Sequence, residues 1–136
     1  MIKIPREIID AIVAHAQKDS PIEACGYLAG EISGAAAEIR EVKKIYQMSN
    51  ADKSEEHFAF DPQEQFNAFK DAIANKMKLI ACYHSHPATP ARPSEEDIRL
   101  AYDPNISYVI VSIAEGKPVV KSFRIKNGAA ENEEIV

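Results

Sequence analysis

A short apolar run that ends in two histidines and a proline constrains this chain most. Leu79–Tyr83 is apolar and short, which favours a buried strand, and it continues directly into a His-Ser-His-Pro sequence. Alternate side chains of a strand point to one face, so His84 and His86 project together, roughly 7 Å apart along the strand. Pro87 has no N–H to donate and is expected to end the strand.

A proline-containing loop follows, and a helix is expected to begin at Ser94, with Asp97 in its first turn. Two histidines and one carboxylate are the ligand count of a hydrolytic zinc site, whose fourth position is left for water. Taken singly, each residue has an ordinary explanation: a lone histidine is usually a surface or core residue, and S-x-x-D is a fair N-cap with an acidic third residue. Their combination in one strand–loop–helix unit favours the metal site, and Asp97 is not expected to ligate a metal and cap the helix together.

The same segment, H-S-H-P followed by S-E-E-D, resembles the JAMM motif of the MPN/Mov34 metallopeptidases, in a similarity that covers roughly residues 4–126. That family also has an upstream glutamate, for which Glu23 in Pro-Ile-Glu-Ala-Cys-Gly is the candidate. The resemblance implies one Zn²⁺ held by His84, His86 and Asp97. It also implies Glu23 as the general base and Ser94 as a hydrogen-bond donor to the oxyanion. From spacing alone, Glu23 is one of many surface acids.

The pattern of helices mixed with hairpin strands predicts an α+β fold in a single domain, residues 1–136. The resemblance implies the MPN/JAB fold, a curved mixed β-sheet flanked by helices and similar in outline to the cytidine deaminases. The deaminase signature H-x-E…P-C-x-x-C is absent, so that chemistry is not supported. Expected helices are 5–18, 61–78 and 93–102; expected strands are 24–29, 38–48, 57–60, 79–86, 106–113 and 119–125.

Three local expectations can be compared with a structure. Pro5 suits a first helical position, and Asp61 suits the N-cap of the second helix. Asn127-Gly128 is a good hairpin turn, after which residues 131–136 either pair or fray. The second helix is expected to bury one apolar stripe, in preference to presenting it as an interaction surface: Phe66, Phe69, Ile73 and Met77.

Composition excludes several classes of protein. The net charge of −5 argues against nucleic acid as the main partner. The first residues have no apolar segment of a signal peptide, and no apolar run approaches the roughly 18 residues of a membrane helix. Cys25 and Cys82 make neither a disulfide framework nor a C-x-x-C pair, and Cys82 lies too far along the strand from His86 to be a fourth ligand. A cytoplasmic protein is expected.

The resemblance implies a zinc-dependent peptidase or isopeptidase that acts after the C-terminal Gly-Gly of a ubiquitin-like protein. The chain is similar to the small prokaryotic members that process ubiquitin-like sulfur-carrier proteins. The carrier, the leaving group and the oligomeric state stay open. Two rivals are a non-catalytic MPN scaffold and a purely structural zinc site, and iron or manganese also suits such ligands. Asn50 is either a turn residue or part of a substrate groove.

Overall fold

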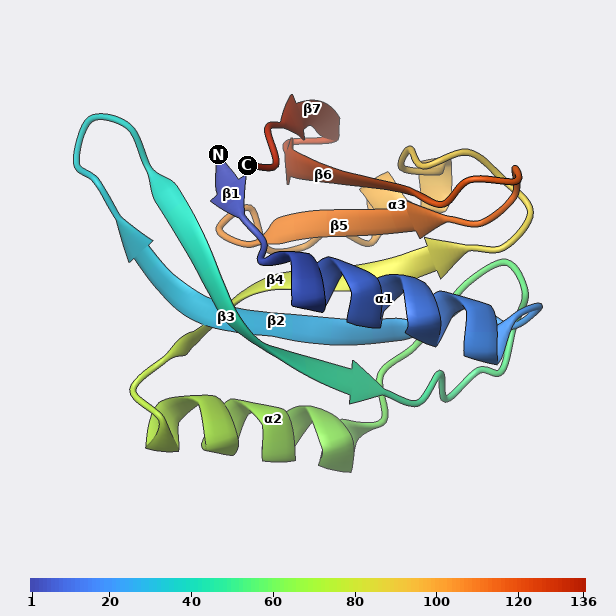
Figure 1. The fold of residues 1–136 in the computed structure, drawn as a ribbon, viewed down its shortest axis with the longest axis horizontal. Helices are drawn as coiled ribbons and strands as arrows, with labels where there is room; N and C mark the ends of the chain where they lie inside the picture. The colour runs from blue at the N-terminus through green and yellow to red at the C-terminus, as the bar shows by residue number, and fades with distance from the viewer.

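Seven strands form one mixed sheet in the computed structural model, which describes residues 1–136 (Figure 1). Their order across the sheet is β1-β3-β2-β4-β5-β6-β7, and β4 pairs antiparallel with β2 but parallel with β5. The predicted α+β class, with a curved mixed sheet between helices, is confirmed. The strands are β1 (Ile2–Lys3), β2 (Cys25–Ser33), β3 (Ile39–Met48), β4 (Lys78–His86), β5 (Ser107–Ser112), β6 (Val119–Lys126) and β7 (Ala129–Glu133).

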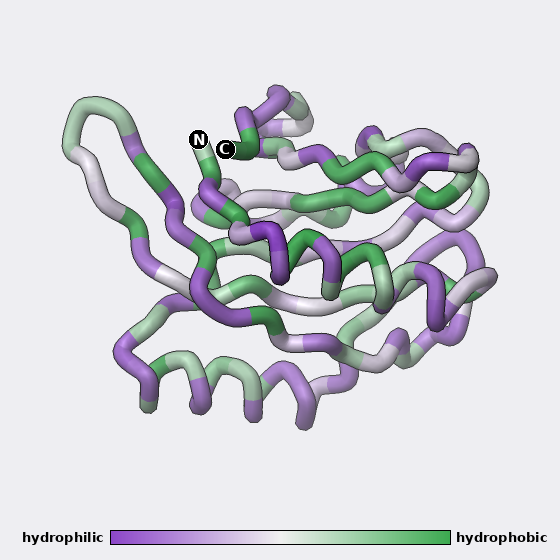
Figure 2. The backbone as a smooth tube through the Cα atoms, in the orientation of Figure 1, coloured by the Kyte–Doolittle hydropathy of each residue, from purple (hydrophilic) through white to green (hydrophobic).

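Three helices cover the two faces of this sheet. The first, α1 (Arg6–Asp19), packs on one face, and α2 (Pro62–Ala74) and α3 (Glu95–Arg99) lie on the other (Figure 1). The longest hydrophobic stretches lie in the strands of the sheet, whereas hydrophobic and hydrophilic residues alternate along α1 and α2 (Figure 2). None of the three helices has the length and apolar character that crossing a membrane requires.

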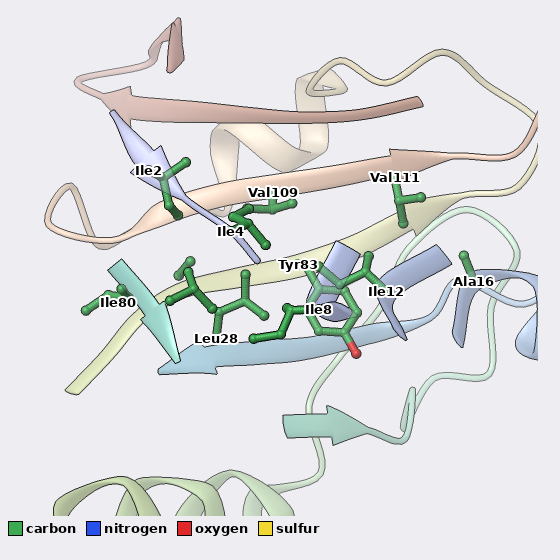
Figure 3. Close-up of a cluster of buried hydrophobic side chains, with 12 residues drawn as sticks. Ile2, Ile4, Ile8, Ile12, Ala16, Leu28, Ile80, Tyr83, Val109 and Val111 are labelled. Atoms are coloured by element: carbon green, nitrogen blue, oxygen red, sulfur yellow. The ribbon is translucent and has the colours of Figure 1, made fainter. Parts of the chain in front are cut away.

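The main core lies between α1 and the sheet. Ile8 and Ile12, one helical turn apart on α1, are 6% and 0% exposed. Figure 3 shows them gathered with Leu28 and Tyr83 from the central strands. Tyr83 is fully buried, and its hydroxyl pairs with Nδ1 of His15 at 2.7 Å. Because Tyr83 occupies this face, its neighbours in β4 point to the opposite face, toward α2 and α3.

The predicted buried stripe of α2 is wrong. Phe66, Phe69 and Ile73 are 55%, 51% and 57% exposed, and the helix instead buries Ala68 and Ala72. Ala68 packs with Cys25 and Met48 on the sheet, where only a small side chain lets the helix lie close. The larger side chains therefore form an exposed apolar face. Met77 lies beyond the end of the helix.

Several boundaries also differ from the predictions. Residues 57–60 form no strand and contribute only a bridge between Phe60 and Asn50. The third helix has five residues, with Ser94 as its N-cap, and Pro5 is the N-cap of α1. Residues 131–133 belong to β7, which pairs with β6 across the predicted Asn127-Gly128 turn. Asp61 is the N-cap of α2, as predicted.

Candidate metal centre and active site

The two histidines at the end of β4 converge with Asp97 on one point. Nε2 of His84 and Nε2 of His86 lie 3.1 Å apart, and each lies 3.1 Å from Oδ2 of Asp97. The three side chains are 4%, 5% and 16% exposed. Burial opposes ionisation of Asp97, but its close contacts with His84 and His86 outweigh burial and hold the pKa of Asp97 well below its usual range.

Asp97 reaches this point because α3 begins with a capping box. Ser94 N–H donates to Oδ2 of Asp97, and Asp97 N–H donates to Oγ of Ser94. The same carboxylate oxygen therefore caps the helix and faces both histidines. The structure shows the capping role of Asp97, and its role as a metal ligand stays a prediction. One oxygen offers two lone pairs in different directions, so the two roles are compatible.

The loop after β4 fixes the orientation of the His86 ring. Nδ1 of His86 lies 2.8 Å from the carbonyl oxygen of Pro90, which can only accept, so Nδ1 carries the hydrogen and Nε2 is left as the acceptor. Ser112 of β5 anchors the loop by donating its hydroxyl to the carbonyl of Thr89 at 2.6 Å. Burial lowers the pKa of His86, but the bonds with Asp97 and Pro90 outweigh burial and raise it.

The His84 ring is held by stacking instead. Phe58 lies nearly parallel to it, with ring centroids 4.7 Å apart at an interplanar angle of 24°. Phe58 belongs to the loop between β3 and α2, whose Phe60 stacks in turn on Tyr27 of β2. This loop therefore covers one side of the histidine pair.

Glu23 lies just before β2, and only 4% of it is exposed. Its Oε1 is buried and has no hydrogen-bond partner. Burial raises the pKa of this carboxyl to about 8; His86 opposes the rise, and the acidic side chains of Asp97, Glu96 and Glu56 add to it. A buried acid whose oxygen is free and whose pKa lies near neutrality has the properties of a general base.

Hydrogen bonds hold the Glu23 backbone on both sides. Its N–H donates to the carbonyl of Ser54, and its carbonyl accepts from the side-chain amide of Asn50. The next residue, Ala24, donates its N–H to Oγ of Ser85 at 2.7 Å. Ser85 lies between the two histidines in sequence and points to the other face, so β4 positions both the histidines and the residue next to Glu23.

The three converging atoms fit a metal ion. They all lie within 4.8 Å of one another, and tetrahedral zinc with nitrogen and oxygen ligands places its ligand atoms about 3.3 Å apart. Two imidazole nitrogens with lone pairs and one carboxylate also repel each other unless a proton or a cation lies between them. The donor set therefore suits a divalent cation with one coordination position left open.

An apolar groove runs along β4 to this site. Its volume is about 610 Å³, and both His84 and Asp97 line one end. Cys82 and Tyr108 lie along it, while Phe69 of α2 lines another part. Cys82 is buried, lines the groove and lies outside the group of three converging ligand atoms. The groove is continuous with the exposed apolar face of α2 through Phe69.

A model of the prokaryotic homologs of the JAB domain matches residues 5–126. The chain belongs to this JAB/MPN family. Members of the family are generally metal-dependent, and the grouped histidines and aspartate are where this JAB domain can hold an ion. The resemblance drawn from the sequence motif is confirmed.

The relatives of this JAB domain include named peptidases. It is 35% identical over 136 residues to the CysO-cysteine peptidase of Mycobacterium tuberculosis, covering 99% of this chain and 90% of the relative. It is 30% identical over 129 residues to a probable TtuB-protein conjugate cleaving protease of Thermus thermophilus, covering 94% and 78%. A desampylase of Pyrococcus furiosus is 30% identical over 95 residues, covering 70% and 62%.

Solved structures agree on the fold. A protein of Desulfitobacterium hafniense has a TM-score of 0.90 at 47% identity, covering 100% of this chain and 92% of its own. A JAB1/MPN domain protein of Archaeoglobus fulgidus has a TM-score of 0.56 at 22% identity, covering 99% and 95%. The JAB fold is therefore shared, and the named relatives are peptidases of this family.

Sequence reasoning missed three residues of the site. Phe58 and Ser112 lie in segments without a motif, and they act on the histidines only through tertiary contacts. The interpretation of Asn50 as a turn residue is confirmed, because its Oδ1 accepts the N–H of Asp52 and its carbonyl accepts the N–H of Lys53. Its burial and its side-chain bonds to four further backbone groups were not predicted. The sequence pattern around a polar residue in a segment of low periodicity does not indicate whether that residue is buried.

Proposed function

We propose that this JAB domain is a zinc-dependent peptidase or isopeptidase that hydrolyses the amide bond after the C-terminal Gly-Gly of a ubiquitin-like carrier protein. One observation carries the proposal: three ligand atoms converge, and two of the residues that supply them line an apolar groove. The unpartnered buried carboxyl of Glu23 lies close enough for the charges of His86 and Asp97 to act on its pKa. A structural metal site needs no open position, no free acid and no groove.

Zinc bound to His84, His86 and Asp97 would lower the pKa of a coordinated water to about 7 and so supply a nucleophile near neutral pH. The residues of the chain do the rest. Glu23 takes the proton from the attacking water and passes it to the leaving amine, a role that contributes roughly 10²–10⁴-fold. Its buried, unpaired Oε1 supports this role because no internal hydrogen bond has to be broken first.

Ser94 stabilises the oxyanion in this proposal. Its Oγ already accepts from Asp97 N–H, while its own hydroxyl hydrogen has no acceptor in the structure. The hydroxyl is therefore free to donate to a substrate oxygen. A donor placed where charge develops in the transition state is worth roughly 10²–10³ in kcat.

The groove and the names of the relatives support the substrate class. Two relatives are named for cleaving CysO–cysteine and TtuB–protein conjugates, and others are named desampylases. An extended tail suits a groove that ends at the metal, and glycine lets the backbone approach the ligands without a side chain. We place the body of the carrier on the apolar face of α2, because Phe69 belongs both to that face and to the groove.

The test is cleavage of a ubiquitin-like carrier protein extended by a few residues beyond its Gly-Gly end. Wild type, wild type with chelator, and Glu23→Gln are compared by mass spectrometry of the products. Cleavage after Gly-Gly that both the chelator and the variant abolish is expected. A carrier with Leu in place of the last Gly is the matched control and should resist cleavage. Absence of cleavage by protein shown to hold one equivalent of zinc would contradict the proposal for that carrier class.

A further inference from the structure

Asn50 stands out among the buried polar residues outside the ligands and the base. It is 6% exposed, and its side chain makes five hydrogen bonds, all to backbone groups. Its Nδ2 donates to the carbonyls of Glu23 at 3.0 Å, His57 at 2.9 Å and Ser54 at 3.4 Å. Its Oδ1 accepts from the N–H groups of Asp52 at 3.0 Å and Ala59 at 3.2 Å.

These bonds join the base to the loop that covers the histidines. The loop carries Phe58 between two residues that Asn50 binds, His57 and Ala59, and the Phe58 ring stacks on His84. Ser54 of the same loop accepts the N–H of Glu23, so the base is bonded to the loop through both of its backbone groups. The side chain of Asn50 therefore connects Glu23 with the segment whose Phe58 stacks on His84; we call this stacking contact the clamp on His84.

Asn50 supplies most of the side-chain hydrogen bonds to the backbone of this loop, beside one from Glu56 N–H to Oγ of Ser54. The loop contains no helix and no strand, and its regular pairing is limited to the bridge between Asn50 and Phe60. An irregular segment without a ladder depends on side-chain bonds to satisfy its backbone. The bonds made by Asn50 satisfy backbone groups of Asp52, Ser54, His57 and Ala59, in addition to the carbonyl of Glu23.

We infer that Asn50 is a positioning residue, which holds the general base Glu23 and, through Phe58, the metal ligand His84 in one fixed frame. This inference rests on the proposed function for the role of Glu23, but not for the clamp on His84. It assigns Asn50 no contact with substrate. Its effect on the metal passes through the Phe58 ring, and its effect on catalysis passes through the backbone of Glu23.

The test uses Asn50→Asp, which keeps the oxygen that accepts from Asp52 and Ala59 but places a second oxygen against three carbonyls. Asn132→Asp is the matched control, because the same change is made at an exposed position in β7. Zinc affinity is measured by competition with a chromophoric chelator, and kcat is measured at saturating zinc. Melting and amide hydrogen exchange of residues 51–59 report on stability and on the loop.

At a temperature well below the melting temperature of Asn50→Asp, we expect this variant to bind zinc about 10–100-fold more weakly than wild type. Its kcat should be about 10²-fold lower, and its amide hydrogens in residues 51–59 should exchange faster. Asn132→Asp should match wild type. A variant that only melts earlier, with wild-type kcat and zinc affinity while folded, would assign Asn50 a purely structural role and overturn the inference.

A double-mutant cycle tests the route through Phe58. Phe58→Leu alone should weaken zinc, because the stacking on His84 is lost while the bonds of Asn50 remain. Adding Asn50→Asp to Phe58→Leu should then change zinc affinity by less than a factor of about two; full additivity would overturn the route. If Asn50→Asp does not fold, Phe58→Leu decides the clamp alone, and unchanged zinc affinity overturns it.

These measurements also separate the inference from the proposed function. Zinc affinity and hydrogen exchange need no substrate. Wild type that binds zinc but cleaves no Gly-Gly carrier would contradict the proposed function. The zinc affinities of the Asn50 and Phe58 variants and of the double mutant would still decide the inference.

Discussion

Ser94 and Asp97 hold each other through two reciprocal hydrogen bonds, of 2.9 Å from Ser94 N–H to Oδ2 and 3.0 Å from Asp97 N–H to Oγ. Because Oδ2 also faces the two histidines, the first turn of α3 and the metal centre share one atom. A change at Ser94 is therefore expected to act on helix stability, on metal affinity and on catalysis.

Ser94→Ala removes the acceptor for Asp97 N–H and the hydroxyl proposed for the oxyanion. The free energy of unfolding should fall by about 1 kcal/mol, kcat should fall about 10²–10³-fold, and zinc should bind more weakly. Steady-state kinetics, chelator competition and chemical unfolding measure the three effects. Ser94→Thr keeps the hydroxyl and should stay close to wild type. Wild-type kcat in Ser94→Ala would remove the oxyanion role.

Metal should stabilise the fold through the histidine pair. Zinc at a hundredfold excess over its Kd adds about 2.7 kcal/mol to the free energy of unfolding, and chelator should remove that gain. His84→Ala should abolish the response to zinc in thermal melts. The control is His57→Ala, since His57 is half-exposed and absent from the ligand group. A zinc response that survives in His84→Ala would place the ion elsewhere.

Stability of the metal-free protein should fall as pH rises from about 4.5 toward 8. The pKa of Glu23 is raised from 4.5 to about 8 by burial, so the folded protein holds this proton more tightly than the unfolded chain does. The stabilisation is complete below pH 4.5 and is lost as pH rises through 8. Glu23→Gln cannot ionise and should melt roughly 5–10 °C above wild type at pH 9.

Comparing the two proteins in chelator isolates this effect from the histidines, which titrate in both. The difference between the melting curves should shrink as the pH is lowered toward 4.5. Equal pH dependence in wild type and Glu23→Gln would mean that Glu23 ionises normally in the folded protein.

The exposed face of α2 should affect binding and not folding. Phe69→Ser changes a side chain that is 51% exposed, so the free energy of unfolding should change by no more than about 0.5 kcal/mol. KM for the carrier should rise while kcat changes little. Ile32→Ser is the control, because Ile32 is 40% exposed at the β2–β3 hairpin, outside the groove. Large destabilisation by Phe69→Ser would mean that Phe69 is buried in the folded protein, as the sequence predicted.

Strong local patterns made most of the fold predictable. The period of α1 and the capping residues Asp61 and Pro62 of α2 are short-range signals, and both helices lie within a few residues of their predicted bounds. The three candidate ligands were also predictable from short-range signals, namely the His-x-His spacing on a strand and the helix start before Asp97, and the structure brings them together.

Tertiary choices were not predictable. Helix α2 has two faces that can pack, one of alanines and one of large apolar residues, and periodicity favours the larger one. The structure packs the alanine face, with Ala68 against Cys25 and Met48, and this contact between distant parts of the chain leaves no trace in the local pattern. Likewise, the burial of Glu23 comes from packing and bonds made by distant residues, Asn50 and Ser54 among them, which no local pattern contains.

The parallel pairing of β4 with β5 sets the order in which this protein can mature. Ser112 at the end of β5 fixes the loop that orients His86, and β5 is made only after both histidines and Asp97. A chain still being synthesised therefore presents its candidate ligands before it can align them. Alignment of these candidate ligands therefore has to wait until β5 has joined the sheet.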